Sequence, residues 1–133
     1  GKGNIDESLE HRKGYTQFEY VTEGLPHLLA ASDYAVSRAG SNAIFELLSV
    51  LKPMLLIPLS AAQSRGDQLL NASLFKSLGI AKVAQEEELD EVSLASLFTT
   101  LRDDKDNLVS NMRKVSHTKS PETMADLILS YKN

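Results

Sequence analysis

The sequence contains no cysteine and no tryptophan, and its first residue is glycine rather than methionine. Without cysteine the chain forms no disulfide and no thiolate metal site, which is compatible with the cytoplasm. A first residue other than methionine is typical of a fragment, so we expect the natural protein to extend upstream of Gly1.

Long apolar runs and a positive charge balance are also missing. No segment approaches the roughly 18 apolar residues that a membrane span needs, and no signal peptide is visible. The formal net charge of −4 argues against a nucleic-acid partner. The sequence has no HExxH motif, no paired histidines and no carboxylate cluster at metal-ligand spacing, so it predicts no metal site.

What the sequence does have is enough apolar material for one core. Its 133 residues are 42% hydrophobic and 24% charged, as in an ordinary globular domain. Short apolar runs typical of strands alternate with segments of helical periodicity, which predicts an α/β fold with a parallel sheet and flanking helices. The expected strands are 15–22, 34–37, 54–58 and 80–84. The expected helices are 25–32, 42–50, 68–77, 89–101, one through Leu108, Met112 and Val115, and one that begins at Pro121.

The most informative stretch is 33–46, DYAVSRAGSNAIFE. A short buried strand is followed by Arg38 and Gly40, and Ser41 stands where the N-cap of the helix over 42–50 is expected. The first N–H groups of a helix lack internal partners, and the helix dipole favours an anion there. Gly40 allows a ligand to approach the backbone, and the guanidinium of Arg38 suits phosphate.

Glu46 lies on the same expected helix, about one and a half turns from its start. Helical side chains lean towards the N-terminus, so this carboxylate can reach a hydroxyl pair lying over the helix start. A phosphate site beside a hydroxyl-binding carboxylate indicates a nucleotide. The alternative is that this turn binds nothing, as in most strand–glycine–helix turns, and that Glu46 is a solvated residue.

Three segments carry a family resemblance: SRAGSNAIFE (37–46), KPMLLIPL (52–59) and SRGDQLLNA (64–72). In this order they resemble the C-terminal domain of the MurG family of GT-B glycosyltransferases. The resemblance is strong to about residue 79 and looser beyond it. It implies that residues 1–133 are part of a Rossmann-like donor domain. It also implies transfer of N-acetylglucosamine from UDP-N-acetylglucosamine to lipid I, which gives lipid II in peptidoglycan synthesis.

The resemblance implies roles for individual residues and no metal or other cofactor. Arg38 and the helix start would stabilise the leaving diphosphate, Glu46 would hold the ribose, and the Thr22 backbone would read the uracil. Gln68, with Asp67, would orient the sugar, because an amide donates and accepts at once; Asp67 is also a candidate N-cap for the helix over 68–77. The implied substrate-binding residues are Thr22, Arg38, Gly40, Ser41, Asn42, Ala43, Ile44, Phe45, Glu46, Asp67 and Gln68.

The resemblance also implies that parts of the enzyme lie outside this chain. According to this resemblance, Gly1 falls just after the second strand of the domain, and the N-terminal domain, which would carry the acceptor site and the catalytic base, is absent. We therefore assign no catalytic residue here and expect the fragment alone to be inactive. The full-length protein would be cytoplasmic and peripheral on the cytoplasmic face of the membrane, where its lipid-linked acceptor lies.

The missing strands predict an uncovered edge on the strand over 34–37. Such an edge exposes unsatisfied backbone groups and invites association. The strand over 17–22 then has three options: to pair with 34–37, to pair with another chain, or to lose its strand structure. We expect a repacked sheet or a dimer through that edge.

Two other functions stay open from the sequence. One is another UDP-sugar transferase of the same architecture, either a diacylglycerol glycosyltransferase or a subunit of a two-chain UDP-N-acetylglucosamine transferase. The other is a non-catalytic binding module, against which the presence of Arg38, Glu46 and Gln68 argues.

Overall fold

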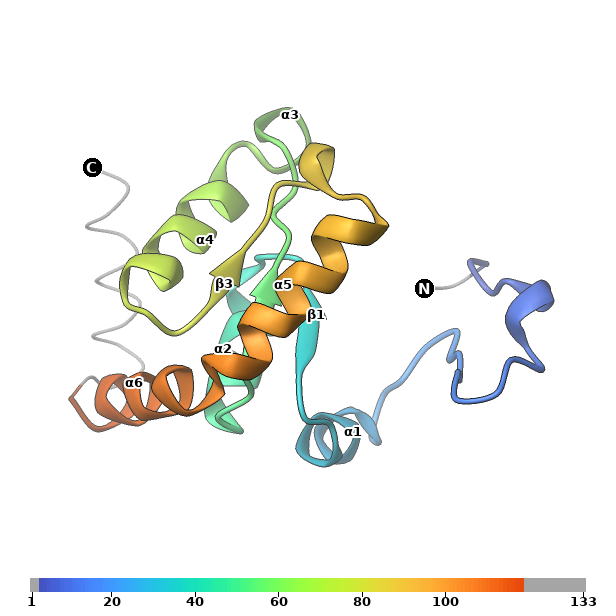
Figure 1. Cartoon of the computed structure of the whole chain (residues 1–133), viewed down its shortest axis with the longest axis horizontal. Helices are drawn as coiled ribbons and strands as arrows, with labels where there is room; N and C mark the ends of the chain where they lie inside the picture. The colour runs from blue at the N-terminus through green and yellow to red at the C-terminus, as the bar shows by residue number, and fades with distance from the viewer. Residues whose placement is uncertain (1–2, 119–133) are drawn as a thin grey trace.

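The computed structural model describes residues 3–118, in which strands alternate with helices (Figure 1). Within these residues the sheet is parallel, in the order β1 (Ala35–Ser37), β2 (Met54–Leu56), β3 (Lys82–Val83). The helical elements are η1 (Glu7–Leu9), α1 (Leu25–Ala31), α2 (Ser41–Ser49), α3 (Ala61–Ser64), α4 (Asp67–Ser77), η2 (Glu86–Glu88), α5 (Glu91–Asp103) and α6 (Lys105–Thr118). The predicted α/β fold with a parallel sheet and flanking helices is confirmed.

The middle strand, β2, is buried along its whole length. Its backbone has a neighbour on each side, with Ala35 opposite Met54 and Leu55 opposite Lys82. Figure 1 shows α5 crossing in front of the sheet and α2 behind it. The apolar run MLLIPL therefore behaves as expected for a strand that is covered on both faces. The expected strands 34–37, 54–58 and 80–84 form one contiguous parallel sheet, as predicted.

Helices α2 and α4 pack together behind the sheet. Phe45 of α2 meets Phe75 of α4 edge-to-face, with ring centroids 6.1 Å apart and an interplanar angle of 84°. The helices on both faces contribute to one core, as their helical apolar spacing predicted. Its largest fully buried side chains are Ile44, Met54, Leu55, Leu56, Phe75, Ile80, Leu101, Leu108 and Met112.

Two predicted N-caps are wrong by one residue. Helix α2 begins at Ser41, and Gly40 occupies the N-cap position; α4 begins at Asp67, and Gly66 occupies the N-cap position. In both cases the preceding glycine makes the turn, with φ of +84° at Gly66, so Ser41 and Asp67 are already helical. The expected loop 60–68 also contains the short helix α3. The helix expected from Pro121 lies outside the described residues.

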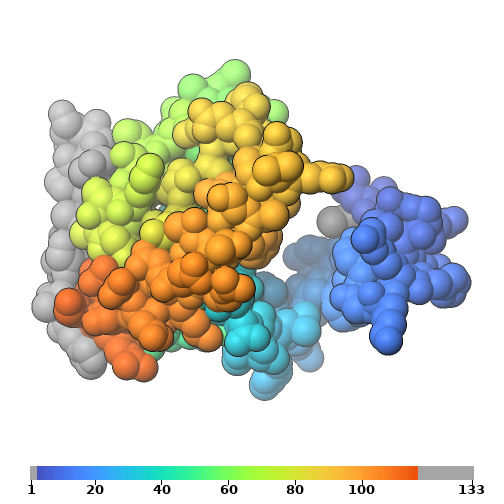
Figure 2. Space-filling view, viewed as in Figure 1, coloured from blue at the N-terminus to red at the C-terminus, as the bar shows by residue number. Residues whose placement is uncertain are grey.

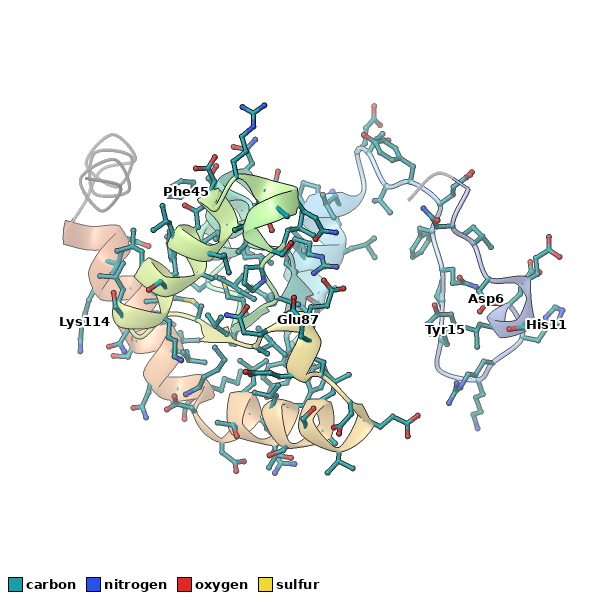
Figure 3. The ribbon with its side chains drawn as sticks, turned by 90° about the horizontal axis from the view of Figure 1, so that it is seen from above. Asp6, His11, Tyr15, Phe45, Glu87 and Lys114 are labelled. Atoms are coloured by element: carbon teal, nitrogen blue, oxygen red, sulfur yellow. The ribbon has the colours of Figure 1, made fainter. Side chains whose placement is uncertain are left out.

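The predicted strand over 15–22 is wrong, because these residues form no strand. Residues 3–23 form a loop that stands away from the body (Figures 1 and 2), and Figure 3 shows Asp6, His11 and Tyr15 within it. Hydrogen bonds join its two limbs, from Gly3 N to Glu19 Oε1 at 2.8 Å and from Asp6 N to Gln17 Oε1 at 2.9 Å.

Loss of strand structure has a simple cause: a strand must pair its backbone groups with a neighbour. The sheet has not repacked, and β1 keeps an edge with no partner strand among the described residues. Val36 on β1 is 45% exposed. A dimer through this edge stays a prediction.

A buried lysine fixes the position of α1. Lys52 is 7% exposed, and its Nζ donates to the carbonyl of Ser32 and, at 3.5 Å, to that of Ala30. These carbonyls end α1, where the helix dipole favours a cation. Lys52 therefore ties α1 to the corner between α2 and β2. Among residues 3–118, no helix has the length and apolar character required to cross a membrane.

Gly79 ends α4, as the sequence predicted, with a left-handed φ of +67°. A Cβ built at Gly79 would lie 2.8 Å from Nδ2 of Asn111, which donates to the Gly79 carbonyl at 3.1 Å. Gly66 has a similar φ of +84°, but a Cβ there has no atom within 4 Å. A comparison of substitutions at Gly79 and Gly66 can therefore separate the cost of the left-handed backbone from the cost of the steric contact with Asn111.

We expect Gly79→Ala to lower the free energy of unfolding by about 2–3 kcal/mol. The left-handed backbone contributes ~1–2 kcal/mol and the displaced Asn111 hydrogen bond ~1 kcal/mol. Gly66→Ala, the matched control, should cost only the first contribution. Denaturant unfolding of both variants measures the difference, and equal losses would contradict a steric role for Asn111.

Candidate functional site

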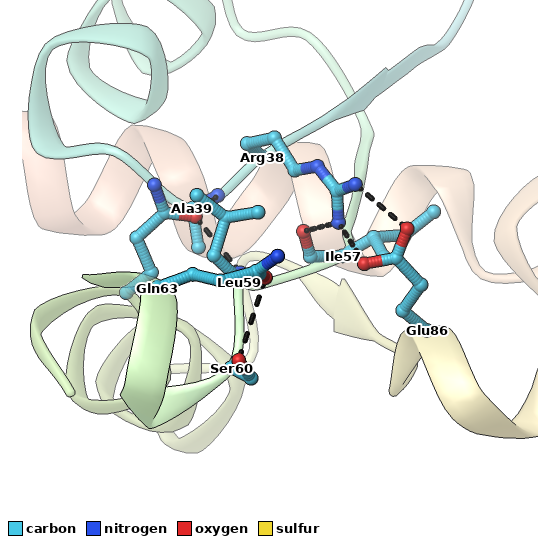
Figure 4. A network of polar contacts seen from close by, with 8 residues as sticks. Arg38, Ala39, Ile57, Leu59, Ser60, Gln63 and Glu86 are labelled. Atoms are coloured by element: carbon cyan, nitrogen blue, oxygen red, sulfur yellow. Dashed lines mark hydrogen bonds and ion pairs between the residues drawn. The ribbon is translucent and has the colours of Figure 1, made fainter. Parts of the chain in front are cut away.

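The three parallel strands end at the same edge of the sheet, so the loops that follow them meet there. These are the turn 38–40 after β1, the loop 57–66 after β2, and η2 after β3. Figure 4 shows side chains and carbonyls from all three loops joined by hydrogen bonds. This edge carries most of the residues that the sequence singled out.

The start of α2 offers unpaired backbone donors. Gly40 is extended, with φ −69° and ψ 138°, and makes no side-chain cap. Ile44 is the first residue whose N–H bonds within the helix, to Gly40 O at 3.1 Å. The N–H groups of Ser41, Asn42 and Ala43 precede that bond and have no intrahelical acceptor. Ser41 and Asn42 are exposed, so the helix start is open to an anion.

Glu46 lines two hollows between α1 and α2, which share Leu25, Leu29 and Glu46. The first, of about 180 Å³, reaches β1 and the helix start at Ala43. The second, of about 210 Å³, includes Thr22, and we call it the α1–α2 hollow; its lining residues are Thr22, Leu25, Pro26, Leu29, Glu46, Ser49 and Val50. The structure thus brings Thr22 and Glu46 to one hollow, and Glu46 also lines the second hollow, which reaches Ala43 near the start of α2.

The side chains of two predicted contact residues pack in or against the core, and their contact with a ligand stays a prediction. Ile44 is fully buried, and its backbone N–H is used within α2. Phe45 packs on Phe75 between the two helices. The side chains of Ile44 and Phe45 therefore support α2 and do not line the hollows.

Arg38 is held by an acidic partner that the sequence analysis missed. Its Nη2 and Nη1 donate to the two carboxylate oxygens of Glu86 at 2.8 and 2.9 Å, and Nη1 also reaches Ile57 O at 3.3 Å (Figure 4). These hydrogen bonds lower the pKa of Glu86 and raise the pKa of Arg38. The pair lines a hollow of about 310 Å³ with Val36, Ser37, Ile57 and Leu89. The acidic run after the last predicted strand was the available signal for Glu86.

The first turns of α4 contact the turn after β1. Gln68 Oε1 accepts from the backbone N–H of Ala39 at 3.2 Å and of Leu59 at 3.0 Å. Asn71 Nδ2 donates to Ala39 O at 3.0 Å. The oxygen of Gln68 is therefore occupied within the protein, which leaves its NH₂ group as the donor for a ligand. Asn71 was missed, although its i, i+3 spacing from Gln68 places both on one face of α4.

Asp67 is exposed in the first turn of α4, beside the same loop. Within residues 3–118, no group of three or more His, Cys, Asp or Glu side chains is arranged to hold a metal. The site thus consists of backbone donors, carboxylates, an arginine and amides, which is a set suited to a polar, anionic ligand.

Known proteins match this chain over nearly its whole length. The model of the glycosyltransferase family 28 C-terminal domain matches residues 1–127. Relatives from Geobacillus kaustophilus and Geobacillus thermodenitrificans are each 56% identical over 128 residues, covering 96% of this chain and 36% of each relative. A relative from Clostridium botulinum is 48% identical over 131 residues, covering 98% of this chain and 37% of its own length.

All three relatives carry the name UDP-N-acetylglucosamine--N-acetylmuramyl-(pentapeptide) pyrophosphoryl-undecaprenol N-acetylglucosamine transferase. The chain spans little more than a third of their length. The extent of the family match, together with the identity to these relatives, shows that this chain belongs to the family of glycosyltransferase family 28 C-terminal domains.

Proposed function

We propose that this chain is the donor-binding part of a MurG-type enzyme, which transfers N-acetylglucosamine from UDP-N-acetylglucosamine to lipid I and forms lipid II. The observation that carries the proposal is the start of α2, which has no side-chain cap and lies beside a hollow lined by Ala43 and Glu46; Glu46 also lines the hollow that includes Thr22. The names of the relatives support this donor and acceptor over a diacylglycerol acceptor.

In this proposal the uridine occupies the α1–α2 hollow. The Glu46 carboxylate accepts hydrogen bonds from the ribose hydroxyls, and the backbone around Thr22 meets the uracil. The diphosphate lies on the N–H groups of Ser41, Asn42 and Ala43, where Gly40 presents no side chain. The NH₂ group of Gln68, with Asp67 beside it, orients the sugar.

The proposed reaction is attack by a hydroxyl of the lipid-linked acceptor on the anomeric carbon, as the bond to the diphosphate oxygen breaks. Negative charge then grows on the leaving UDP, where the α2 dipole and its N–H groups stabilise it. The proposal assigns no metal or other cofactor.

The remaining parts of the proposal concern the full-length protein. We place the acceptor site and the catalytic base in an N-terminal domain outside this chain. Because the acceptor is lipid-linked, we also propose that the full-length enzyme is cytoplasmic and works at the cytoplasmic face of the membrane. Titration of the full-length protein with nucleotide sugars tests the donor, and equal affinity for UDP-N-acetylglucosamine and GDP sugars would overturn the proposal.

We expect Glu46→Ala to weaken UDP binding by about 1–3 kcal/mol, since hydrogen bonds to a charged group are lost. Glu46 is an exposed helix residue, so the melting temperature should change little. Calorimetric titration with UDP measures the effect. Glu91→Ala, which removes an exposed glutamate from the first turn of α5, is the control. Unchanged affinity in Glu46→Ala would mean that Glu46 is a solvated surface residue.

Gln68→Ala should weaken binding of UDP-N-acetylglucosamine more than binding of UDP. It should also lower the free energy of unfolding by about 1–3 kcal/mol, because the N–H groups of Ala39 and Leu59 lose their acceptor. Titrations well below the melting temperature separate the two effects. Gln63→Ala, in exposed α3, is the control. Equal losses for both ligands would mean that Gln68 does not read the sugar.

A phosphate role for Arg38 requires its guanidinium to leave Glu86. We therefore expect Glu86→Gln to tighten UDP binding several-fold, because a neutral amide holds the guanidinium less strongly than a carboxylate does. The free energy of unfolding should change little, since the pair is exposed. Arg38→Ala should weaken UDP binding. If neither variant changes the affinity, the only role of Arg38 is to link the loops that follow β1, β2 and β3.

A further inference from the structure

The turn that precedes α2 is held by two residues outside it. Ala39 lies between Arg38 and Gly40 and is fully buried. Its N–H donates to Gln68 Oε1 at 3.2 Å, and its C=O accepts from Asn71 Nδ2 at 3.0 Å. Both backbone groups of this one residue are thus bound by side chains of the same face of α4.

Asn71 is suited to holding the turn and not to touching a ligand. It is 5% exposed, and its NH₂ group is already directed to the Ala39 carbonyl. A buried carbonyl that loses its donor carries the desolvation penalty of an unpaired polar group. The bond therefore restricts the peptide plane between Ala39 and Gly40, which begins the turn into α2.

That peptide plane decides where the helix start points. Gly40 is the N-cap, and its carbonyl accepts the first helical hydrogen bond, from Ile44 N at 3.1 Å. A rotation at Ala39–Gly40 would move the N–H groups of Ser41, Asn42 and Ala43 together. Such donors stabilise charge best when their orientation is fixed before the ligand arrives.

We propose that Asn71 is a positioning residue for the diphosphate: it fixes the Ala39 carbonyl and so aims the first N–H groups of α2. The proposal rests on the proposed function, because it requires the diphosphate to bind at that helix start. It differs from a sugar-reading role, since Asn71 acts through Ala39 on the phosphate part of the ligand alone.

The test compares three ligands, uridine, UDP and UDP-N-acetylglucosamine, by calorimetric titration of the full-length protein. Asn71→Leu keeps the branched shape, adds no charge and removes the donor. Asn111→Leu is the matched control: Asn111 also donates Nδ2 to a backbone carbonyl 32 residues away, that of Gly79 at 3.1 Å. That contact lies before β3, at the opposite edge of the sheet from Ala39.

We expect Asn71→Leu to reduce the preference for UDP over uridine by about tenfold, the order expected for weakened hydrogen bonds to a charged group. Uridine affinity and the preference for UDP-N-acetylglucosamine over UDP should stay unchanged. Asn111→Leu should lower stability and leave all three affinities unchanged. If Asn71→Leu does not fold, Asn71→Ser takes its place with the same expected order of effects.

The outcomes separate the two proposals. If the unaltered protein binds UDP no more tightly than uridine, the proposed function fails. If it does prefer UDP and Asn71→Leu keeps that preference, only the positioning role fails. Loss of the preference for UDP-N-acetylglucosamine over UDP would instead make Asn71 a sugar contact, and equal losses for all three ligands would make it a general packing residue.

Discussion

The need of the buried strand β2 to find hydrogen-bond partners for its backbone N–H and C=O groups organises the described part of the molecule. Met54, Leu55 and Leu56 have no exposed surface, so their N–H and C=O groups depend on neighbouring strands. β1 and β3 supply these partners in parallel, which brings the ends of three strands to one edge. The turn before α2, the loop before α4 and the acidic η2 meet for that reason. The candidate site is thus a consequence of how the backbone of the middle strand finds its hydrogen-bond partners.

Local patterns were sufficient for most of the fold. The run MLLIPL predicted a doubly covered strand, the spacing of Ile44, Leu47 and Leu48 predicted the buried face of α2, and Gly79 predicted the end of α4. Residues 15–22 show where such patterns stop being informative. Their alternation describes which side chains would share a face, but a strand forms only beside a partner, and none pairs with these residues in the described chain.

The candidate site also has a part that local sequence patterns predicted and a part that they did not. Gly40, Ser41 and Glu46 were predictable because they are close together in the chain and their geometry follows from a single helix. The hydrogen bonds of Arg38 to Glu86 and of Asn71 to Ala39 join residues 48 and 32 positions apart, and no local spacing encodes such pairs. Likewise, Phe45 lies beside Glu46 in the sequence, yet its ring faces Phe75 because of how α2 packs against α4.

Lys52 links the fold to the site over a longer path. Its ammonium group binds the carbonyls at the end of α1. Helix α1 in turn supplies Leu25, Pro26 and Leu29 to the wall of the α1–α2 hollow. The width of that hollow therefore depends on a cation that lines neither hollow and contacts no proposed ligand group. A substitution of Lys52 would therefore change the wall of the hollow as well as the stability of the fold. A protein without this lysine would need another donor for the backbone carbonyls at the end of α1 to keep that helix in place.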